Sequence, residues 1–341
     1  MRRLRVLALV PEGSIPPTDL EGFSEKEIAR WKMEYDILAA LGGLGHFVEC
    51  VEGRGDLAPI REAVERWKPH MVFNMLEEFH GYVAFDQNVV GYLELLRVPY
   101  TGCNPRGLVL ARDKALTKKI LSYHRIRVPR FGVFPRRRRV RRSARLRFPL
   151  LVKSLTEEAS TGISQASIVR DDAQLAKRVE FIHDQVGSDA IAEEYIEGRE
   201  LYLGILGNRR LQTFPLWELI FENLPEGAPN IATARIKFDL EYQKRCGITT
   251  RAARGLPEGS DGRIAHLGKR IYRVLDLSGY ARLDLRLQED GQVFVLEANP
   301  NPDLSADEDF ALSAEAAGLT FDRLVQRILN LGLTYSKNWA Q

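Results

Sequence analysis

The stretch Gly279–Ser305, GYARLDLRLQEDGQVFVLEANPNPDLS, has the pattern of a β-hairpin with charged residues at one end. Apolar and charged residues alternate before the Asp290-Gly291 turn, and a second apolar run follows it, as in two antiparallel strands. Because side chains alternate between faces, Arg282 and Asp284 are expected on one face of the first strand. Three residues of the returning strand are expected to share a face: Val293, Val295 and Glu297.

This hairpin is expected to gather oxygen ligands at one end. The returning strand ends at Glu297 and Asn299, before two prolines that stop regular pairing. With Asp284 on the neighbouring strand, two carboxylates and an amide converge beside Arg282. Such oxygens are the ligands that Mg²⁺ takes when substrate phosphates complete its coordination. The sequence therefore predicts a magnesium site, and an exposed hairpin with solvated charges is the alternative.

The same residues resemble the metal-binding end of the ATP-grasp fold, in its D-alanine–D-alanine ligase branch. That branch has R-x-D, a hairpin and L-E-x-N-x-x-P, and the matching residues here are Arg282-Leu283-Asp284 and Leu296–Pro302. The resemblance implies a fold of α/β and α+β type, with three lobes and ATP held between the later two. It implies a Rossmann-like N-terminal domain at 1–103, a central ATP-grasp subdomain at 104–192 and a C-terminal ATP-grasp subdomain with the metal site at 193–341.

The composition is that of an ordinary globular protein. The 341 residues are 45% hydrophobic and 28% charged, and the formal net charge of +3 indicates neither a nucleic-acid nor a membrane partner. Three scattered cysteines without CxxC spacing argue against a disulfide framework or a zinc site. No apolar stretch reaches the length of a membrane span, and the basic, apolar start lacks a cleavage site. A cytoplasmic location is predicted.

The order of strand and helix patterns predicts a parallel sheet in the first hundred residues, where strands alternate with helices. Strands are predicted at 4–10, 46–51, 71–75, 98–102, 148–153, 163–169 and 201–206. Helices are predicted at 25–41, 57–67, 87–96, 171–186, 262–275 and 321–331.

Upstream segments match the nucleotide-binding parts of the same family. Phe148–Lys153 is predicted to be a strand that ends in a lysine, and the small, hydroxyl-rich loop that follows suits a polyphosphate. Glu193–Glu200 resembles the family hinge E-x-[FWY]-[IL]-x-G-x-E, whose backbone reads adenine and whose last glutamate takes the ribose hydroxyls. The resemblance implies ATP contacts at Lys114, Lys153, Ser160, Glu193, Glu194, Ile196, Glu200 and Leu296.

The resemblance also implies catalytic roles. Mg²⁺, or Mn²⁺ in its place, would be held by Asp284, Glu297 and Asn299 and would neutralise the transferring phosphoryl group. Arg282 would stabilise the oxyanion of the tetrahedral intermediate, and Lys237 would reach the γ-phosphate from a lid. His80 matches the histidine of the family's H-G-x-x-G-E-D-G, but most of that glycine-acidic core is replaced here. A structural or solvated histidine is the alternative.

Twelve positions, Arg136–Arg147, contain eight arginines. Such a run is typical of a solvated loop, and the alternatives are a site for an acidic partner or a weak contact with nucleic acid. Interleaved aromatic residues are lacking, which argues against a platform for stacked single-stranded bases.

The substrate residues depart from the family pattern. Ala159 and Phe238 stand where the ligases have a serine and a tyrosine that place the first D-alanine. The acidic run Asp307–Asp309 stands where a substrate carboxylate would bind, and it suits an amine or cationic group instead. The sequence therefore predicts an ATP-dependent carboxylate–amine ligase for small amino-acid or peptide substrates other than D-alanine. The alternatives are D-alanine–D-alanine ligation, glutamate addition to a protein terminus, a non-catalytic ATP-binding module and a nucleic-acid scaffold; a homodimer is also open.

Overall fold

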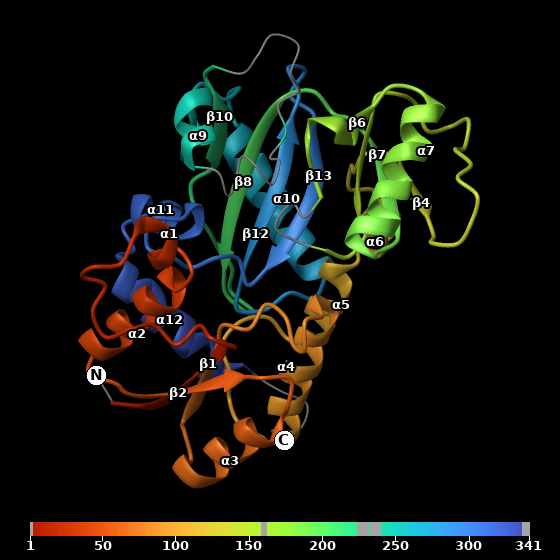
Figure 1. Ribbon diagram of the computed structural model, residues 1–341. Helices are drawn as coiled ribbons and strands as arrows, with labels where there is room; N and C mark the ends of the chain where they lie inside the picture. The colour runs from red at the N-terminus through yellow and green to blue at the C-terminus, as the bar shows by residue number, and fades with distance from the viewer. Residues whose placement is uncertain (1–2, 158–161, 224–230, 232–239, 336–341) are drawn as a thin grey trace.

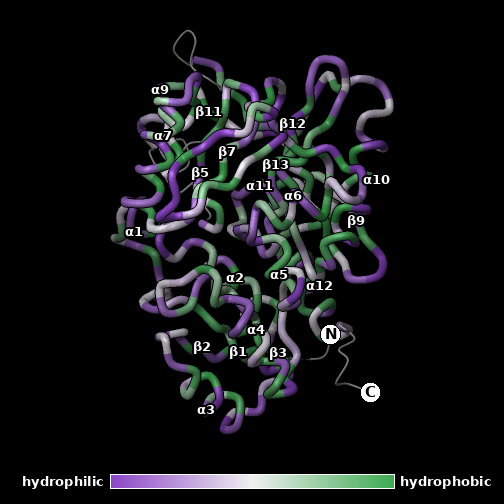
Figure 2. The backbone as a smooth tube through the Cα atoms, turned by 90° about the vertical axis from the view of Figure 1, so that its right-hand side faces the viewer, coloured by the Kyte–Doolittle hydropathy of each residue, from purple (hydrophilic) through white to green (hydrophobic). Residues whose placement is uncertain are grey.

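A computed structural model describes residues 3–157, 162–223, 231 and 240–335 of the chain. These residues form three β-sheets, which Figure 1 shows as an N-terminal lobe below, a sheet of long strands above it and a third lobe beside that sheet. The side view in Figure 2 shows β1, β2 and β3 below the body that contains β12 and β13. The mixed α/β, three-lobed fold predicted from the sequence is confirmed.

The N-terminal lobe contains a parallel sheet in the order β2-β1-β3. The five central residues of β1, VLALV, are all buried, as expected for a strand covered on both faces of its sheet. The predicted parallel sheet is therefore confirmed. Its elements are β1 (Arg5–Pro11), α1 (Glu25–Ile28), α2 (Lys32–Gly43), β2 (Phe47–Gly53), α3 (Ala58–Trp67), β3 (Met71–Asn74), a 3₁₀ turn (Val83–Phe85) and α4 (Asp86–Leu95).

Two predictions for this lobe are wrong in detail. The helix predicted at 25–41 is two helices, because Trp31 leaves the helical region with φ −122° and ψ 6°. The strand predicted at 98–102 is only a bridge between Val72 and Tyr100. Pro99 lacks an amide donor, and Gly102 turns the chain away with φ +91°.

The central lobe is an antiparallel sheet in the order β4-β7-β5-β6. The strand predicted at 163–169 shortens to two residues, because Ser164 and Ser167 cap a 3₁₀ turn reciprocally. The helix predicted at 171–186 ends as a π-helical turn before the left-handed Gly187. Its elements are β4 (Phe131–Phe134), β5 (Leu150–Ser154), a 3₁₀ turn (Gln165–Ser167), β6 (Ile168–Val169), α7 (Asp172–Phe181), a π turn (Ile182–Val186) and β7 (Ala190–Glu194).

The C-terminal lobe is built on a sheet in the order β11-β10-β8-β12-β13, with the short β9 paired to β8. One face of β8 and β12 is apolar and packs on α10, while the other face carries charged residues. The elements of this lobe and of the chain that leads to the central lobe are α5 (Pro105–Arg112), α6 (Lys114–Tyr123), β8 (Arg199–Leu206), β9 (Gln212–Thr213), β10 (Trp217–Phe221), α9 (Leu240–Cys246), β11 (Ile248–Ala252), α10 (Ser260–Val274), β12 (Tyr280–Leu287), β13 (Val293–Pro300), α11 (Asp309–Ala316) and α12 (Phe321–Thr334).

The N-terminal and C-terminal lobes share buried cores. One cluster joins side chains of β1 and β3 to those of β8, α10 and β12, and α12 packs on α2 and β3. Gly279 has φ +71°, and a Cβ there would lie 2.5 Å from the Gly102 carbonyl oxygen, so the start of β12 meets the N-terminal lobe backbone to backbone. The domain boundaries predicted above stay predictions. Within the described residues, none of the helices is long and apolar enough to span a bilayer.

Candidate active site

Strands β12 and β13 place the predicted metal ligands on one face of the C-terminal sheet. In this hairpin Asp284 lies opposite Glu297, and Arg282 lies opposite Asn299. Directly opposed residues of an antiparallel pair point to the same face. The structure thus brings two carboxylates, an amide and a guanidinium together, as the sequence predicted.

The face predicted for Glu297 is wrong, because β13 contains a β-bulge. Val295 and Glu297 pair with consecutive residues of β12, so Leu296 is an extra residue between them. The extra residue shifts the alternation, and Val295 and Ala298 both face the core although they are three positions apart. Glu297 therefore turns away from Val295 and toward Asp284.

Arg282 holds Asp284 in a two-point ion pair. Its Nε lies 2.8 Å from Oδ1 and its Nη2 lies 3.1 Å from Oδ2 of Asp284. Its guanidinium also stacks 4.6 Å above the Tyr202 ring and lies 3.8 Å from an Asp309 oxygen. Burial lowers the pKa of Arg282, but the charge and hydrogen bonds of Asp284 more than offset this effect. The pKa of Arg282 therefore lies above its ordinary value. Arg282 is thus a permanent cation beside the two carboxylates.

Three lysines and two glutamates form a chain of charges next to this face, and all of them except the partly exposed Glu297 are buried. Glu193 lies 3.4 Å from the Lys118 ammonium and 3.3 Å from that of Lys153. Glu297 lies 3.1 Å from the Lys114 ammonium and 3.9 Å from that of Lys153. The lysines come from α6 and the end of β5, so the chain joins the central lobe to the C-terminal sheet.

Burial sets the protonation of these lysines. It lowers the pKa of Lys118 to about 8 and lowers that of Lys114, with Glu193 and Glu297 respectively opposing the effect. Burial also lowers the pKa of Lys153, but two glutamates outweigh it and the pKa lies above its ordinary value. Each contact is worth about 4 kcal/mol of attraction at an effective dielectric constant of 20, against several kcal/mol to desolvate each ion. With one more ammonium than carboxylate, the cluster gains little stability for the fold and suits a polyanionic ligand.

Comparisons with known proteins give this cluster a family. Residues 121–330 match the model of the D-ala D-ala ligase C-terminus. A D-alanine–D-alanine ligase of Desulforudis audaxviator is 31% identical over 301 residues, which cover 86% of this chain and 90% of that ligase. An uncharacterised protein, y4sG, of Sinorhizobium fredii is 33% identical over 308 residues, or 86% of this chain and 85% of that protein.

The chain belongs to the D-alanine–D-alanine ligase family. A solved D-alanine–D-alanine ligase of Bacillus anthracis in complex with ATP has the same fold, with a TM-score of 0.73, 22% identity and 97% of each chain covered. As a member of this family the chain is an ATP-dependent, ADP-forming carboxylate–amine ligase, and its cofactors are ATP and Mg²⁺. The donors on the β12–β13 face fit Mg²⁺, because they are two carboxylates and an amide that already face cations.

The hinge of this ligase runs from β7 into β8, and its acidic side chains are already bonded. Glu194 Oε1 accepts a 3.0 Å hydrogen bond from the Arg147 amide. Glu200 is buried, and its Oε2 accepts a 2.7 Å bond from Arg286 Nη2 while the Tyr202 hydroxyl donates to its Oε1 at 3.1 Å. Arg286 also donates to the Gly198 carbonyl at 3.1 Å, which ties the hinge to β12. Ile196 is half-buried in the same hinge.

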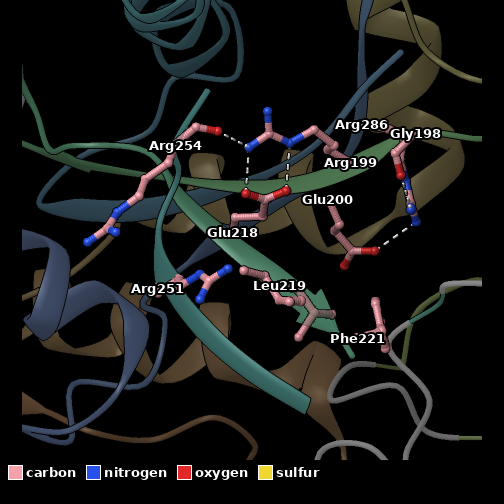
Figure 3. Close-up of a pocket in the computed structure, with 10 residues that line it drawn as sticks. Gly198, Arg199, Glu200, Glu218, Leu219, Phe221, Arg251, Arg254 and Arg286 are labelled. Atoms are coloured by element: carbon pink, nitrogen blue, oxygen red, sulfur yellow. Dashed lines mark hydrogen bonds and ion pairs between the residues drawn. The ribbon is translucent and has the colours of Figure 1, made fainter. Parts of the chain in front are cut away.

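A cavity of about 440 Å³ opens beside Glu200. Figure 3 shows Arg286 directed at Glu200 and Gly198, and Arg199 directed at Glu218 on the neighbouring strand. Two arginine–glutamate pairs therefore line this cavity, and one of them contains Glu200, the predicted ribose ligand.

Other predicted site residues lie elsewhere. His80 is exposed, has a left-handed backbone with φ 56°, and its ring lies directly against Gly55. In the described part of the ligase, no hydrogen bond or ion pair joins His80 to Arg282 or Asp284. Ser160 and Lys237 lie outside the described residues, as do Ala159 and Phe238. Among the described residues there is also no group of three His, Cys, Asp or Glu side chains that could hold a metal. The predicted ligands Asp284 and Glu297 therefore need the Asn299 amide as a third ligand.

Sequence reasoning missed two charged partners. Arg286 follows Arg282 and Asp284 at the same two-residue spacing on β12, so strand alternation alone places it on the active face. Lys118 lies four residues after Lys114 on α6, and no role for it was predicted. The structure makes it the buried partner of Glu193 and the donor, at 2.6 Å, to the carbonyl of the bulged Leu296.

Proposed function

We propose that this ligase uses ATP to activate a carboxylate and joins it to a cationic amine rather than to D-alanine. The carboxylate takes the γ-phosphoryl group and ADP leaves. The amine nitrogen then attacks the acyl carbon, loses a proton and displaces inorganic phosphate, so that one amide bond forms. Small amino-acid or peptide substrates are part of the proposal, and bound Mg²⁺ would neutralise the transferring phosphoryl group.

The charged residues described above take the following roles in this proposal. Asp284, Glu297 and Asn299 hold the metal, which requires Lys114 and Lys153 to leave Glu297 and to turn toward phosphate oxygens. Arg282 faces the developing oxyanion. Glu200 accepts the ribose hydroxyls and the hinge backbone near Ile196 reads adenine. The proposed lid lysine is Lys237, and His80 is a weaker candidate because of its position beside Gly55.

The observation that supports a cationic acceptor is a buried carboxylate, Glu34, that faces other carboxylates. Burial, with smaller contributions from the charges of Glu77 and Asp303, raises the pKa of Glu34 to about 7. Glu34 lies on α2, which is joined to the loop after β13: Asp36 accepts a 2.9 Å hydrogen bond from the Ala306 amide. Carboxylates therefore gather beyond the metal-binding end of β13, with the Lys32 ammonium between Asp36 and Asp307. An excess of carboxylates at this end would repel an anionic acceptor and attract a cationic one.

Two polar groups on this side, the Ser305 hydroxyl and the Arg282 guanidinium, already have partners. The Ser305 hydroxyl donates to Asp303 at 2.7 Å. The guanidinium of Arg282 is shared between Asp284 and Asp309. A substrate carboxylate would have to compete with both of these contacts, whereas a second ammonium group would add a partner for Asp303.

The test is a panel of amines, each offered with a panel of carboxylates, ATP and Mg²⁺, with phosphate release as the readout and mass analysis of the amide product. Diamines and basic amino acids are expected to give the fastest turnover. Efficient turnover with D-alanine as the only amino acid would overturn the acceptor proposal and leave the ligase assignment intact. The proposal also includes an anionic partner at Arg136–Arg147, and a homodimer stays a prediction.

A further inference from the structure

The segment Arg136–Arg147, RRRRVRRSARLR, is strongly basic, whereas the rest of the ligase has a negative net charge. It has eight arginines and no acidic residue, so it carries +8; the whole chain carries +3, which leaves −5 on the rest. The segment joins β4 to β5, and β4 is an edge strand of the central sheet. Figure 1 shows it as the yellow loop at the right-hand edge, beside β4 and α7 and away from the N-terminal lobe.

Two of the arginines hold the loop in place. Arg136 Nη1 donates to the Gly187 carbonyl at 2.7 Å. Arg142 forms a two-point pair with Asp172, at 2.8 and 3.3 Å, and its guanidinium lies 4.4 Å above the Phe148 ring. Leu146 is buried in the core of the central lobe. The loop is therefore anchored in a defined conformation.

The other six arginines have no such structural use. Their side chains are exposed and, within the part of the chain that the structure describes, make neither hydrogen bonds nor ion pairs: Arg137, Arg138, Arg139, Arg141, Arg145 and Arg147. Like charges this close repel one another, and a loop that needs only solubility is served by mixed signs. The segment contains no lysine, and guanidinium groups bind phosphates by two parallel hydrogen bonds.

We infer that this segment docks the phosphate backbone of a structured nucleic acid, without reading its sequence. The exposed residues between the arginines are Ser143 and Ala144, so no aromatic side chain is available to stack on bases or to anchor a protein interface. A row of guanidinium groups on a fixed loop matches a row of phosphates. The surface is distinct from the ligase site, and the inference does not depend on which acceptor that site uses.

The experiment measures binding of the full chain to a fluorescent 20-base-pair RNA duplex, and to the same duplex as DNA, over a range of salt concentrations. The test variant changes five arginines to glutamine and retains Arg147, whose amide binds Glu194: Arg137, Arg138, Arg139, Arg141 and Arg145. The control variant removes the same charge from exposed positions elsewhere: Arg61, Lys119, Lys177, Arg209 and Arg323. Both variants are expected to keep the ATP-dependent ligase activity.

Binding should weaken by at least about 10-fold at 0.1 M salt in the test variant and much less in the control, with a salt slope that is shallower by about 3 to 4. Equal weakening in both variants would show an effect of net charge only and overturn the inference. Absence of duplex binding at low salt would do the same. Tighter binding to polyglutamate or to vesicles of anionic lipid, lost in the same variant, would assign the surface to an acidic protein or a membrane instead.

Discussion

Buried carboxylates have opposite surroundings at two ends of the proposed site. The nucleotide end lies around Glu193 and Glu200, and the acceptor end lies around Glu34. At the nucleotide end Glu193 lies between two lysines, and Glu200 lies 2.7 Å from Arg286. At the acceptor end Glu34 is equally buried, but the charges that act on it are those of Glu77 and Asp303. In the proposed function the first arrangement receives a polyanion and the second receives a cation.

This difference separates the chemistry of the family from the choice of substrate. The parts that match the ligase motifs form a compensated network, whose partners move to phosphate and metal when these bind. The parts that depart from the motifs are rich in carboxylates, only some of which contact a cation: Asp36 and Asp307 contact Lys32, and Asp309 contacts Arg282.

The largest effect is expected at the β12–β13 face. Asp284→Asn and Glu297→Gln should each lower turnover about 10³-fold or more, because the proposed metal loses a carboxylate and roughly 4 kcal/mol of transition-state stabilisation. Phosphate release with saturating ATP measures this loss. Glu289→Gln, in the exposed hairpin turn, removes the same charge and should leave turnover unchanged. If Glu297→Gln retained full turnover while remaining folded, the nucleotide end would not be the catalytic end.

The next largest effect is expected at Arg286, which binds the Glu200 carboxylate. Arg286→Met leaves a buried carboxylate without its cation, which should cost about 3 kcal/mol of stability and raise the KM for ATP about 10-fold with little change in kcat. The preference for ATP over 2′-deoxy-ATP should also fall, because Glu200 is no longer held in one orientation. Arg286→Lys should recover part of the KM but not the bond to Gly198. An unchanged KM in the folded Arg286→Met variant would mean that Glu200 does not bind the ribose.

Strand alternation and short motifs predicted most of the nucleotide end from the sequence. The pattern of β12 gave the shared face of Arg282 and Asp284, and the same spacing extends to Arg286. The bulge at Leu296 was not predictable from alternation, because an extra residue becomes visible only when the two strands are paired. A single-strand reading therefore put Glu297 on the wrong face.

The acceptor end was harder to predict for a different reason. Glu34 lies on a helix whose boundaries were predicted wrongly. The helix breaks at Trp31, where the sequence has neither a proline nor a glycine to indicate a break. The raised pKa of Glu34 comes first from burial and then from the charges of Glu77 and Asp303, which lie far from it in the sequence. Interactions of this kind require the fold, whereas the acidic composition of Asp307–Asp309 could be read directly.

The pKa of Glu34 predicts how stability depends on pH. The folded-state pKa is about 7 and the ordinary value is 4.5, so the folded state binds the proton more tightly. Stability should therefore fall as pH rises from 4.5 to 7, by about 3 kcal/mol from this group, and stay low above 7. Glu34→Gln should remove this loss and raise the free energy of unfolding by about 2 to 3 kcal/mol at pH 8, with no gain near pH 4.5. Denaturant unfolding at the two pH values measures the difference, and an equal gain at both would show that Glu34 is not titrating.

The smallest effect is expected at the acceptor end, in the variant Asp303→Asn. Asp303→Asn removes one of the charges that act on Glu34 and keeps an oxygen that can accept from the Ser305 hydroxyl, while the β12–β13 face is unchanged. The kcat/KM for a cationic amine should fall about 10-fold, which corresponds to about 1.4 kcal/mol, and the KM for ATP should not move. Asp290→Asn, in the exposed hairpin turn, is the matched control for loss of a carboxylate. A neutral amine should lose little in Asp303→Asn, because it never gained from the charge. If neutral and cationic amines were affected alike, Asp303 would support the structure of the loop and the acceptor end would not select by charge.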